Sequence, residues 1–152
     1  KLAAEVAAGE KKAWVARVIP SVAYTDPEIA WVGSSDRSPR IGLLATDGTR
    51  AAKVYERVLD SLGAQTIYPD DADQQLTMSV IYDGVKAGGP IDLAGLEAVI
   101  SRLAQQSDVV VLGCTELSVI HAQQGWSNRP ELVDSIESLA RATILRAGKQ
   151  PR

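Results

Sequence analysis

The chain has 152 residues, of which 45% are hydrophobic and 23% are charged, and its formal net charge at pH 7 is −3. These values predict one globular domain with a core of ordinary size. The slight acidity and the scattered Lys and Arg residues offer no basic surface for nucleic acid, and no apolar run approaches the roughly 18 residues of a membrane span. We therefore expect no nucleic-acid or membrane partner and, because no signal-peptide core opens the sequence, a cytoplasmic location.

The counts of cysteine and histidine limit the redox and metal chemistry of the chain. Cys114 is the only cysteine, so an internal disulfide is excluded. His121 is the only histidine, and its spacing from Cys114 is not that of zinc ligands. We interpret His121 as a surface residue, and we expect no metal and no cofactor.

The first part of the sequence differs in pattern from the rest. Residues 2–19 mix alanines and charged side chains at helical spacing, and Pro20 ends the predicted helix. The following stretch, 21–39, is rich in Pro, Gly and Ser and is typical of an irregular connection. We predict a helix and linker over residues 1–38 and an α/β domain over residues 39–152.

From residue 40 onward, short β-branched runs alternate with segments of helical periodicity. This alternation predicts a parallel sheet with helices on both faces, a three-layer α/β fold. The predicted strands are 41–45, 65–68 and 109–112, and the predicted helices are 50–62, 72–87, 93–106 and a last one within 131–148, with Val133 in a short strand before it. We expect strands 41–45 and 109–112 to be inner strands, adjacent or nearly so.

Cys114 follows the most continuous apolar run of the chain. Val109 to Leu112 are typical of a strand buried on both faces, and Gly113 ends the run at the carboxyl edge, where open α/β sheets place their ligands. The residues leave two interpretations open. Cys114 is either an inert small hydrophobic residue of the core or a reactive thiol at a ligand site.

Four segments in a fixed order carry a resemblance to a known family. They are Gly42–Thr49 with Tyr55 after it, Ile81–Gly88, the Cys-Thr-Glu-Leu motif Cys114–Leu117, and Pro130–Ser135. Over about residues 39 to 148 the chain resembles the cofactor-independent aspartate/glutamate racemase superfamily, and four ordered motifs are far more specific than one.

The resemblance implies one lobe of a two-lobed fold. By this resemblance, the chain corresponds to the second lobe. The Cys-Asn-Thr segment that the family carries in its first lobe does not occur in the sequence. We expect residues 1–38 to be a remnant or an altered segment of that lobe, and an unmatched apolar surface would then favour a homo-oligomer.

The resemblance also implies roles for particular residues. Cys114 would be the catalytic acid/base group for a small amino-acid substrate, and the substrate-binding residues would be Thr46, Gly48, Thr49, Lys86, Thr115 and Glu116. Each has an ordinary structural alternative. The Thr46–Thr49 turn can be a helix cap, Lys86 can be a cation at a helix end, and Glu116 can be an exposed strand-end carboxylate.

Three functions fit these observations. The first is a racemase of aspartate or glutamate that works without pyridoxal phosphate, by cysteine proton transfer. The second is a single-cysteine isomerase or decarboxylase of the same superfamily, and the third is a binding domain without catalysis. Because racemisation needs an acid and a base on opposite faces of the substrate, we expect a chain with one thiol to racemise acidic amino acids hardly at all by itself.

Overall fold

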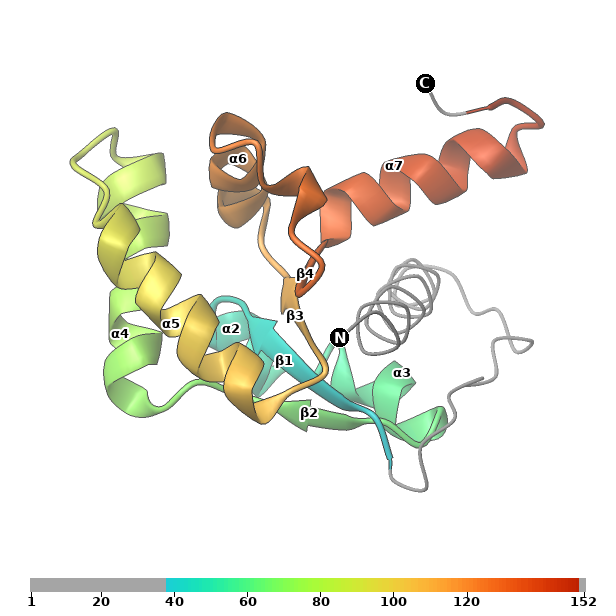
Figure 1. Ribbon diagram of the computed structural model, residues 1–152, viewed down its shortest axis with the longest axis horizontal. Helices are drawn as coiled ribbons and strands as arrows, with labels where there is room; N and C mark the ends of the chain where they lie inside the picture. Colours follow the sequence, from blue (N-terminus) through green and yellow to red (C-terminus); the bar gives the residue numbers. More distant parts are fainter. Residues whose placement is uncertain (1–37, 151–152) are drawn as a thin grey trace.

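Four parallel strands form the centre of the molecule (Figure 1). The computed structural model describes residues 38–150, so the helix and linker predicted before them lie outside the described residues and stay a prediction. The strands stand in the order β2-β1-β3-β4, and their bounds are β1 Arg40–Leu44, β2 Gln65–Ile67, β3 Val109–Leu112 and β4 Leu132–Asp134. The predicted parallel α/β fold is confirmed, and so is the pairing of the two inner strands.

The inner strands are buried along almost their whole length. In the register of β1 and β3, Ile41 lies opposite Val109 and Leu44 opposite Leu112, and all four side chains are at most 1% exposed. Successive side chains of a strand point to opposite faces, so β1 and β3 supply two separate core clusters. Burial on both faces explains why their sequences are continuously apolar.

Helices cover both faces of the sheet and complete the three layers. One cluster contains Tyr55 and Leu59, and the other contains side chains of the helices after residue 79. The helices are α2 Asp47–Ala51, α3 Glu56–Ser61, α4 Asp71–Ser79, the π-helix η2 Val80–Lys86, α5 Leu93–Gln106, α6 Thr115–Gln123, the short 3₁₀ helix η3 Trp126–Asn128 and α7 Ser135–Arg146. None of the helices within residues 38–150 is long and apolar enough to cross a membrane.

Three of these helical segments differ from the sequence-based expectation. The helix predicted over 50–62 is interrupted between α2 and α3, where Lys53 has a left-handed φ of 50°. The helix predicted over 72–87 changes from α to π geometry at Val80. Helix α6, directly after Cys114, was not predicted. The interruption between α2 and α3 contains no Pro or Gly, and it accompanies burial of the Tyr55 side chain, which is 8% exposed.

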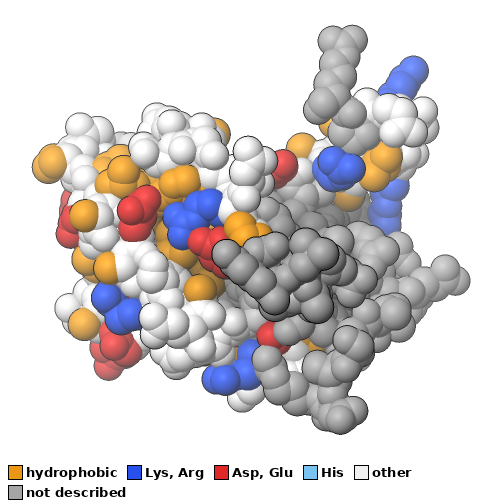
Figure 2. Space-filling view, in the orientation of Figure 1, with side chains coloured by type: hydrophobic (Ala, Val, Ile, Leu, Met, Phe, Trp, Pro, Cys, Tyr) orange, Lys and Arg blue, Asp and Glu red, His pale blue; other side chains and the backbone are white. Residues whose placement is uncertain are grey.

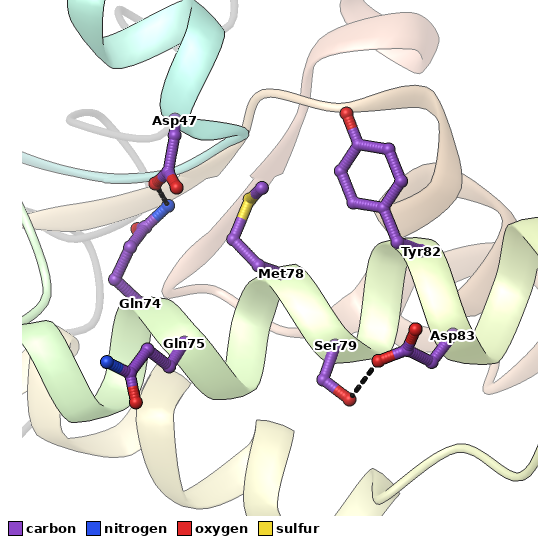
Figure 3. A pocket seen from close by; sticks show the side chains of 7 residues that line it. All are labelled: Asp47, Gln74, Gln75, Met78, Ser79, Tyr82 and Asp83. Atoms are coloured by element: carbon purple, nitrogen blue, oxygen red, sulfur yellow. Dashed lines mark hydrogen bonds between the residues drawn. The ribbon is translucent and has the colours of Figure 1, made fainter.

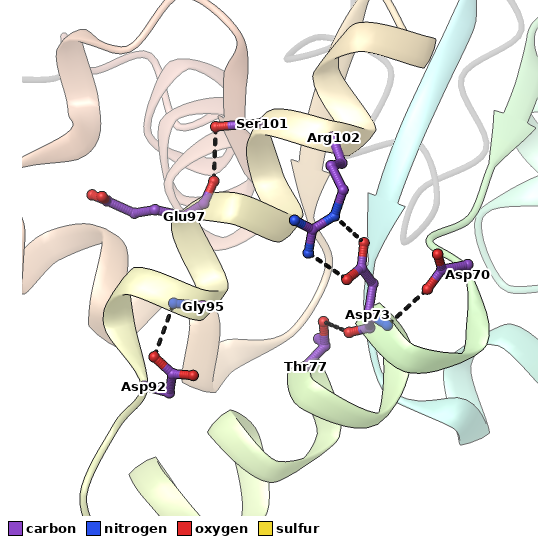
Figure 4. A network of polar contacts seen from close by, with 8 residues as sticks. All are labelled: Asp70, Asp73, Thr77, Asp92, Gly95, Glu97, Ser101 and Arg102. Carbon is purple, nitrogen blue, oxygen red and sulfur yellow. Dashed lines mark hydrogen bonds and ion pairs between the residues drawn. The ribbon is translucent and has the colours of Figure 1, made fainter.

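An ion pair joins helix α4 to helix α5 (Figure 4). The Arg102 guanidinium donates two hydrogen bonds to the Asp73 carboxylate, of 2.9 and 2.5 Å. The Asp70 side chain accepts a hydrogen bond from the backbone N–H of Asp73 and caps α4. The acidic cluster at residues 70–73 is therefore a helix N-terminus. On the face drawn in Figure 2, the described acidic and basic side chains are interspersed with hydrophobic ones.

Candidate active site

Cys114 lies at the carboxyl edge of the sheet, between β3 and α6. The preceding residue, Gly113, donates its N–H to the carbonyl of Leu44 at 2.8 Å, which ties the end of β3 to the end of β1. Cys114 is the N-cap residue of α6, and its side chain is half-buried. Because a helix N-terminus presents unpaired N–H groups and a partial positive charge, this position suits both an anion and a thiolate.

The thiol, a carboxylate and an ammonium group are joined in one chain of contacts. Cys114 Sγ donates a hydrogen bond to Glu116 Oε2 at 2.8 Å. The Thr115 hydroxyl donates to the same oxygen at 2.9 Å, and Lys86 Nζ lies 3.7 Å from the other oxygen, Oε1. The Glu116 side chain is only 16% exposed, so the alternative of an exposed strand-end carboxylate does not hold.

These contacts set the protonation of the thiol. Burial raises the pKa of Cys114, and the hydrogen bond and charge of Glu116 raise it further. The backbone N–H of Glu116 and the Lys86 ammonium act in the opposite direction. The hydrogen bond from Cys114 is the main cause of the lowered pKa of Glu116. At neutral pH the pair is therefore a protonated thiol beside an ionised carboxylate.

Lys86 is positioned by the π-helix η2. It is the last residue of that helix, and its ammonium lies 4.2 Å from the ring centre of Tyr82, a cation–π contact. Tyr82 is 44% exposed. Short π-helical segments are frequent at functional sites, and this one brings Lys86 to Glu116.

The turn after β1 reaches the same edge of the sheet as Cys114, because β1 and β3 are parallel neighbours. Thr46 caps α2 by accepting a hydrogen bond from the N–H of Thr49 at 3.2 Å, and their hydroxyls lie 3.1 Å apart. Gly48 is exposed. The capping role explains these contacts by itself, so substrate binding by Thr46, Gly48 and Thr49 stays a prediction.

A cavity of about 330 Å³ lies along one side of α4 and η2 (Figure 3). Its lining residues are Asp47, Gln74, Gln75, Met78, Ser79, Tyr82 and Asp83. The Gln74 amide donates to the carbonyl of Ala45 at 3.0 Å and to Asp47 Oδ1 at 2.7 Å, which ties α4 to the turn after β1. Tyr82 borders the cavity and also contacts Lys86, whereas Lys86, Glu116 and Cys114 are not among the lining residues.

Two further observations concern buried polar residues that the sequence analysis did not expect. His121 is 4% exposed, so its interpretation as a surface residue is wrong; the inward face of α6 buries it. Asp134 is the last residue of β4 and Ser135 follows it at the same edge of the sheet, and both are buried. Sequence reasoning did not single out their side chains. Within residues 38–150 no three His, Cys, Asp or Glu side chains are placed to hold a metal ion.

The chain is similar to several known proteins. The family model described as Asp/Glu/Hydantoin racemase matches residues 28–143. An uncharacterized protein encoded in the pnlA 3′ region of Pectobacterium carotovorum subsp. carotovorum is 37% identical over 110 residues, which are 69% of this chain and 71% of that protein. A shorter stretch of 36 residues, 24% of this chain, is 64% identical to the dihydrolipoyl dehydrogenase of Buchnera aphidicola subsp. Schizaphis graminum, of which it covers 8%. A match to so small a part of the dehydrogenase gives no information about activity.

A solved structure resembles the fold as a whole. The aspartate racemase of Picrophilus torridus superimposes with a TM-score of 0.62 and 27% sequence identity. The superposition covers 90% of this chain and 53% of the racemase. The chain thus spans about half the length of that enzyme.

Proposed function

Because the chain belongs to the Asp/Glu/hydantoin racemase family, we propose that it takes part in the cofactor-independent racemisation of an acidic amino acid, with Cys114 as an acid/base group. The substrate class is supported by similarity to an aspartate racemase. The observation that carries the proposal is the half-buried thiol of Cys114 at the N-terminus of α6, in hydrogen-bond contact with Glu116.

The chemistry of racemisation accounts for these residue types. The α-proton of an amino acid is very weakly acidic, so its removal needs a close base and groups that neutralise the substrate carboxylate. The hydrogen bond to Glu116 orients the Cys114 side chain, and once Cys114 is ionised its thiolate can take the α-proton. In the reverse direction the Cys114 thiol delivers a proton to the planar carbanion. In both directions the Lys86 ammonium supplies a positive charge beside the Glu116 carboxylate.

The substrate carboxylate has a binding place in the same arrangement. The first N–H groups of α6 have no partner within the helix, and such a terminus attracts an anion. The Thr115 hydroxyl and the Lys86 ammonium stand beside the same carboxylate of Glu116. The Thr46–Thr49 turn supplies further hydroxyls at this edge of the sheet. We propose that these groups hold the carboxylate while Cys114 acts at the adjacent carbon.

A second candidate function is favoured by the cysteine count. Cys114 is the only thiol of the chain, so a second cysteine on the opposite face of the substrate is not available from this sequence. A single thiol can still move a proton on one face, as an isomerase or a decarboxylase requires. This candidate and the racemase share the role of Cys114 and differ in the stereochemical outcome.

Proton exchange in D₂O distinguishes these functions. The purified chain is incubated with L-aspartate or L-glutamate, and loss of the α-proton is followed by NMR while optical rotation is followed by circular dichroism. Exchange with loss of optical activity supports the racemase. Exchange at retained configuration supports one-sided proton transfer, and the absence of any exchange contradicts both.

Variants connect the result to the site. Cys114→Ser should abolish exchange, because a serine hydroxyl is far too weak an acid to serve near neutral pH. Ser101→Ala is the matched control, because Ser101 is exposed on α5 and its hydroxyl bonds only its own helix, at the Glu97 carbonyl. If Cys114→Ser exchanges as fast as the wild type, Cys114 is not the acid/base group.

A further inference from the structure

The cavity along α4 and η2 is lined by acidic side chains and by no basic one. Its volume of about 330 Å³ corresponds to about ten water molecules and lies at the lower end of the range of small-molecule sites. Asp47 and Asp83 are the charged residues of its lining. Both are exposed, and neither forms an ion pair within residues 38–150. The cavity therefore repels an anion and attracts a cation.

A buried amide group lies on the Asp47 side of the cavity (Figure 3). Gln74 is 5% exposed, and its Nε2 donates both to the carbonyl of Ala45 and to Asp47 Oδ1. These two bonds fix the orientation of the amide, because only its nitrogen can donate. The other amide atom, Gln74 Oε1, is buried and has no hydrogen-bond partner in the part of the chain that the structure describes. A buried acceptor is costly to leave unpaired, which favours a ligand that carries a donor.

The two lining carboxylates are each held by one hydrogen bond. Asp47 Oδ1 accepts from Gln74 at 2.7 Å, and Asp83 Oδ2 accepts from the Ser79 hydroxyl at 2.9 Å. The remaining oxygens, Asp47 Oδ2 and Asp83 Oδ1, make no hydrogen bond to a residue within 38–150. They can accept from a ligand without the loss of an existing contact, and a bond between an ammonium group and a carboxylate is charge-assisted.

Met78 and the ring of Tyr82 supply the apolar part of the lining. In Figure 3 both side chains project from the helix on the side where Asp47 lies. The Tyr82 ring already attracts an ammonium group, because Lys86 Nζ lies 4.2 Å from its centre. Lys86 itself is not a lining residue, and its ammonium lies 3.7 Å from Glu116. The negative charge of the lining is therefore not neutralised by this lysine.

We propose that the cavity binds a small aliphatic diamine. Its two ammonium groups match the two unpaired carboxylates, Asp47 and Asp83, and its methylene groups pack on Met78 and Tyr82. The volume leaves room for a chain of about four to six carbons. This ligand differs from the acidic amino acid of the proposed function, so the two proposals stand or fall separately. Because the lining carboxylates are exposed, the attraction is screened by salt.

The test follows the Met78 methyl group by NMR in a chain labelled with ¹³C-methyl methionine. Met78 is the only methionine of the chain and lines the cavity, so a single resonance reports occupancy. Three probes share a four-carbon skeleton and differ in charge: 1,4-diaminobutane is cationic, 1,4-butanediol is neutral and succinate is anionic. We expect a saturable shift with diaminobutane at low salt, which weakens as salt is added, and much smaller shifts with the other two.

Variants connect binding to the two carboxylates. Asp47→Asn and Asp83→Asn remove one charge each and keep a side-chain oxygen for the bonds from Gln74 and Ser79. Each should weaken diaminobutane binding about three- to fivefold, the effect of one exposed ion pair. Asp71→Asn is the matched control, because Asp71 is an exposed carboxylate of α4 that does not line the cavity. Its affinity for diaminobutane should equal that of the wild type.

Several outcomes overturn the proposal. A Met78 shift that butanediol or succinate produces as readily as diaminobutane would show that the cavity does not select a cation. An affinity for diaminobutane that is unchanged in both variants, or the absence of a saturable shift, is equally decisive. If one variant does not fold, as judged by circular dichroism, the other decides alone. No readout depends on α-proton exchange, so a chain that binds diaminobutane without exchanging the proton of aspartate keeps this site and loses the proposed function.

Discussion

The Cys114 thiol donates a hydrogen bond to the Glu116 carboxylate at 2.8 Å, although a single residue separates the two in the sequence. The bond forms because Cys114 is the N-cap of α6 and Glu116 lies in its first turn, where the side chain can turn back toward the cap. The protonation of the thiol is consequently set by its immediate neighbours. Each neighbour moves the thiol pKa in a definite direction, and each direction can be measured.

Replacing Glu116 with glutamine should make the thiol more acidic. The hydrogen bond to the carboxylate and its negative charge both raise the pKa of Cys114, so a neutral amide should lower that pKa. Only the thiolate reacts with iodoacetamide, so alkylation of Cys114 at neutral pH should become several times faster. Glu97→Gln, an exposed change on α5, should leave the rate unchanged. A slower reaction in Glu116→Gln would contradict the assigned direction.

Replacing Lys86 with methionine should have the opposite effect on the same thiol. The Lys86 ammonium lowers the pKa of Cys114, but its effect is smaller than those of burial and of Glu116. The Lys86 side chain is 42% exposed, so solvent screens its charge. We expect a modest rise of the pH midpoint of Cys114 alkylation that shrinks as salt is added. Lys149→Met, near the C-terminus and away from the site, is the control. A midpoint that falls in Lys86→Met would exclude the ammonium as a stabiliser of the thiolate.

The sequence predicted the sheet better than the details of the site. The β-branched run before Gly113 and the alternation of strands and helices are local patterns, and they were sufficient for the inner strands. The interruption at Lys53 and the π-helix η2 were not predictable, because packing of Tyr55 and the contact of Lys86 with Glu116 involve residues distant in sequence. Strand β4 has only three residues, which is too short for periodicity to show that Asp134 stands at the sheet edge.

Substituting Gly42 with alanine should destabilise the fold. A Cβ at Gly42 would lie 2.8 Å from Leu103 Cγ and 2.8 Å from Ser107 Oγ, and Leu103 is buried at 2% exposure. The helix α5 would have to move away from β1, at a cost of about 1–3 kcal/mol in the free energy of unfolding. Urea unfolding measures this loss. Gly48→Ala is the matched control, because the nearest atom to its added Cβ is Thr46 Oγ1 at 3.8 Å, and equal losses in both variants would refute the steric explanation.

Replacing Asp73 with asparagine should lower stability at neutral pH and remove part of the acid sensitivity of the chain. The hydrogen bonds from Arg102 hold the pKa of Asp73 below its ordinary value of 3.8. For a carboxyl group with a lowered folded-state pKa, the stabilisation is complete above the ordinary value and is lost as pH falls through the folded-state value. The thermal midpoints of the wild type and Asp73→Asn should therefore differ clearly at pH 7 and converge as the pH falls through the lowered folded-state pKa of Asp73. Asp71→Asn changes an exposed carboxylate in the same helix turn and should produce a smaller difference at pH 7. A difference between the wild type and Asp73→Asn that is independent of pH would show that the Asp73–Arg102 ion pair does not couple proton binding to folding.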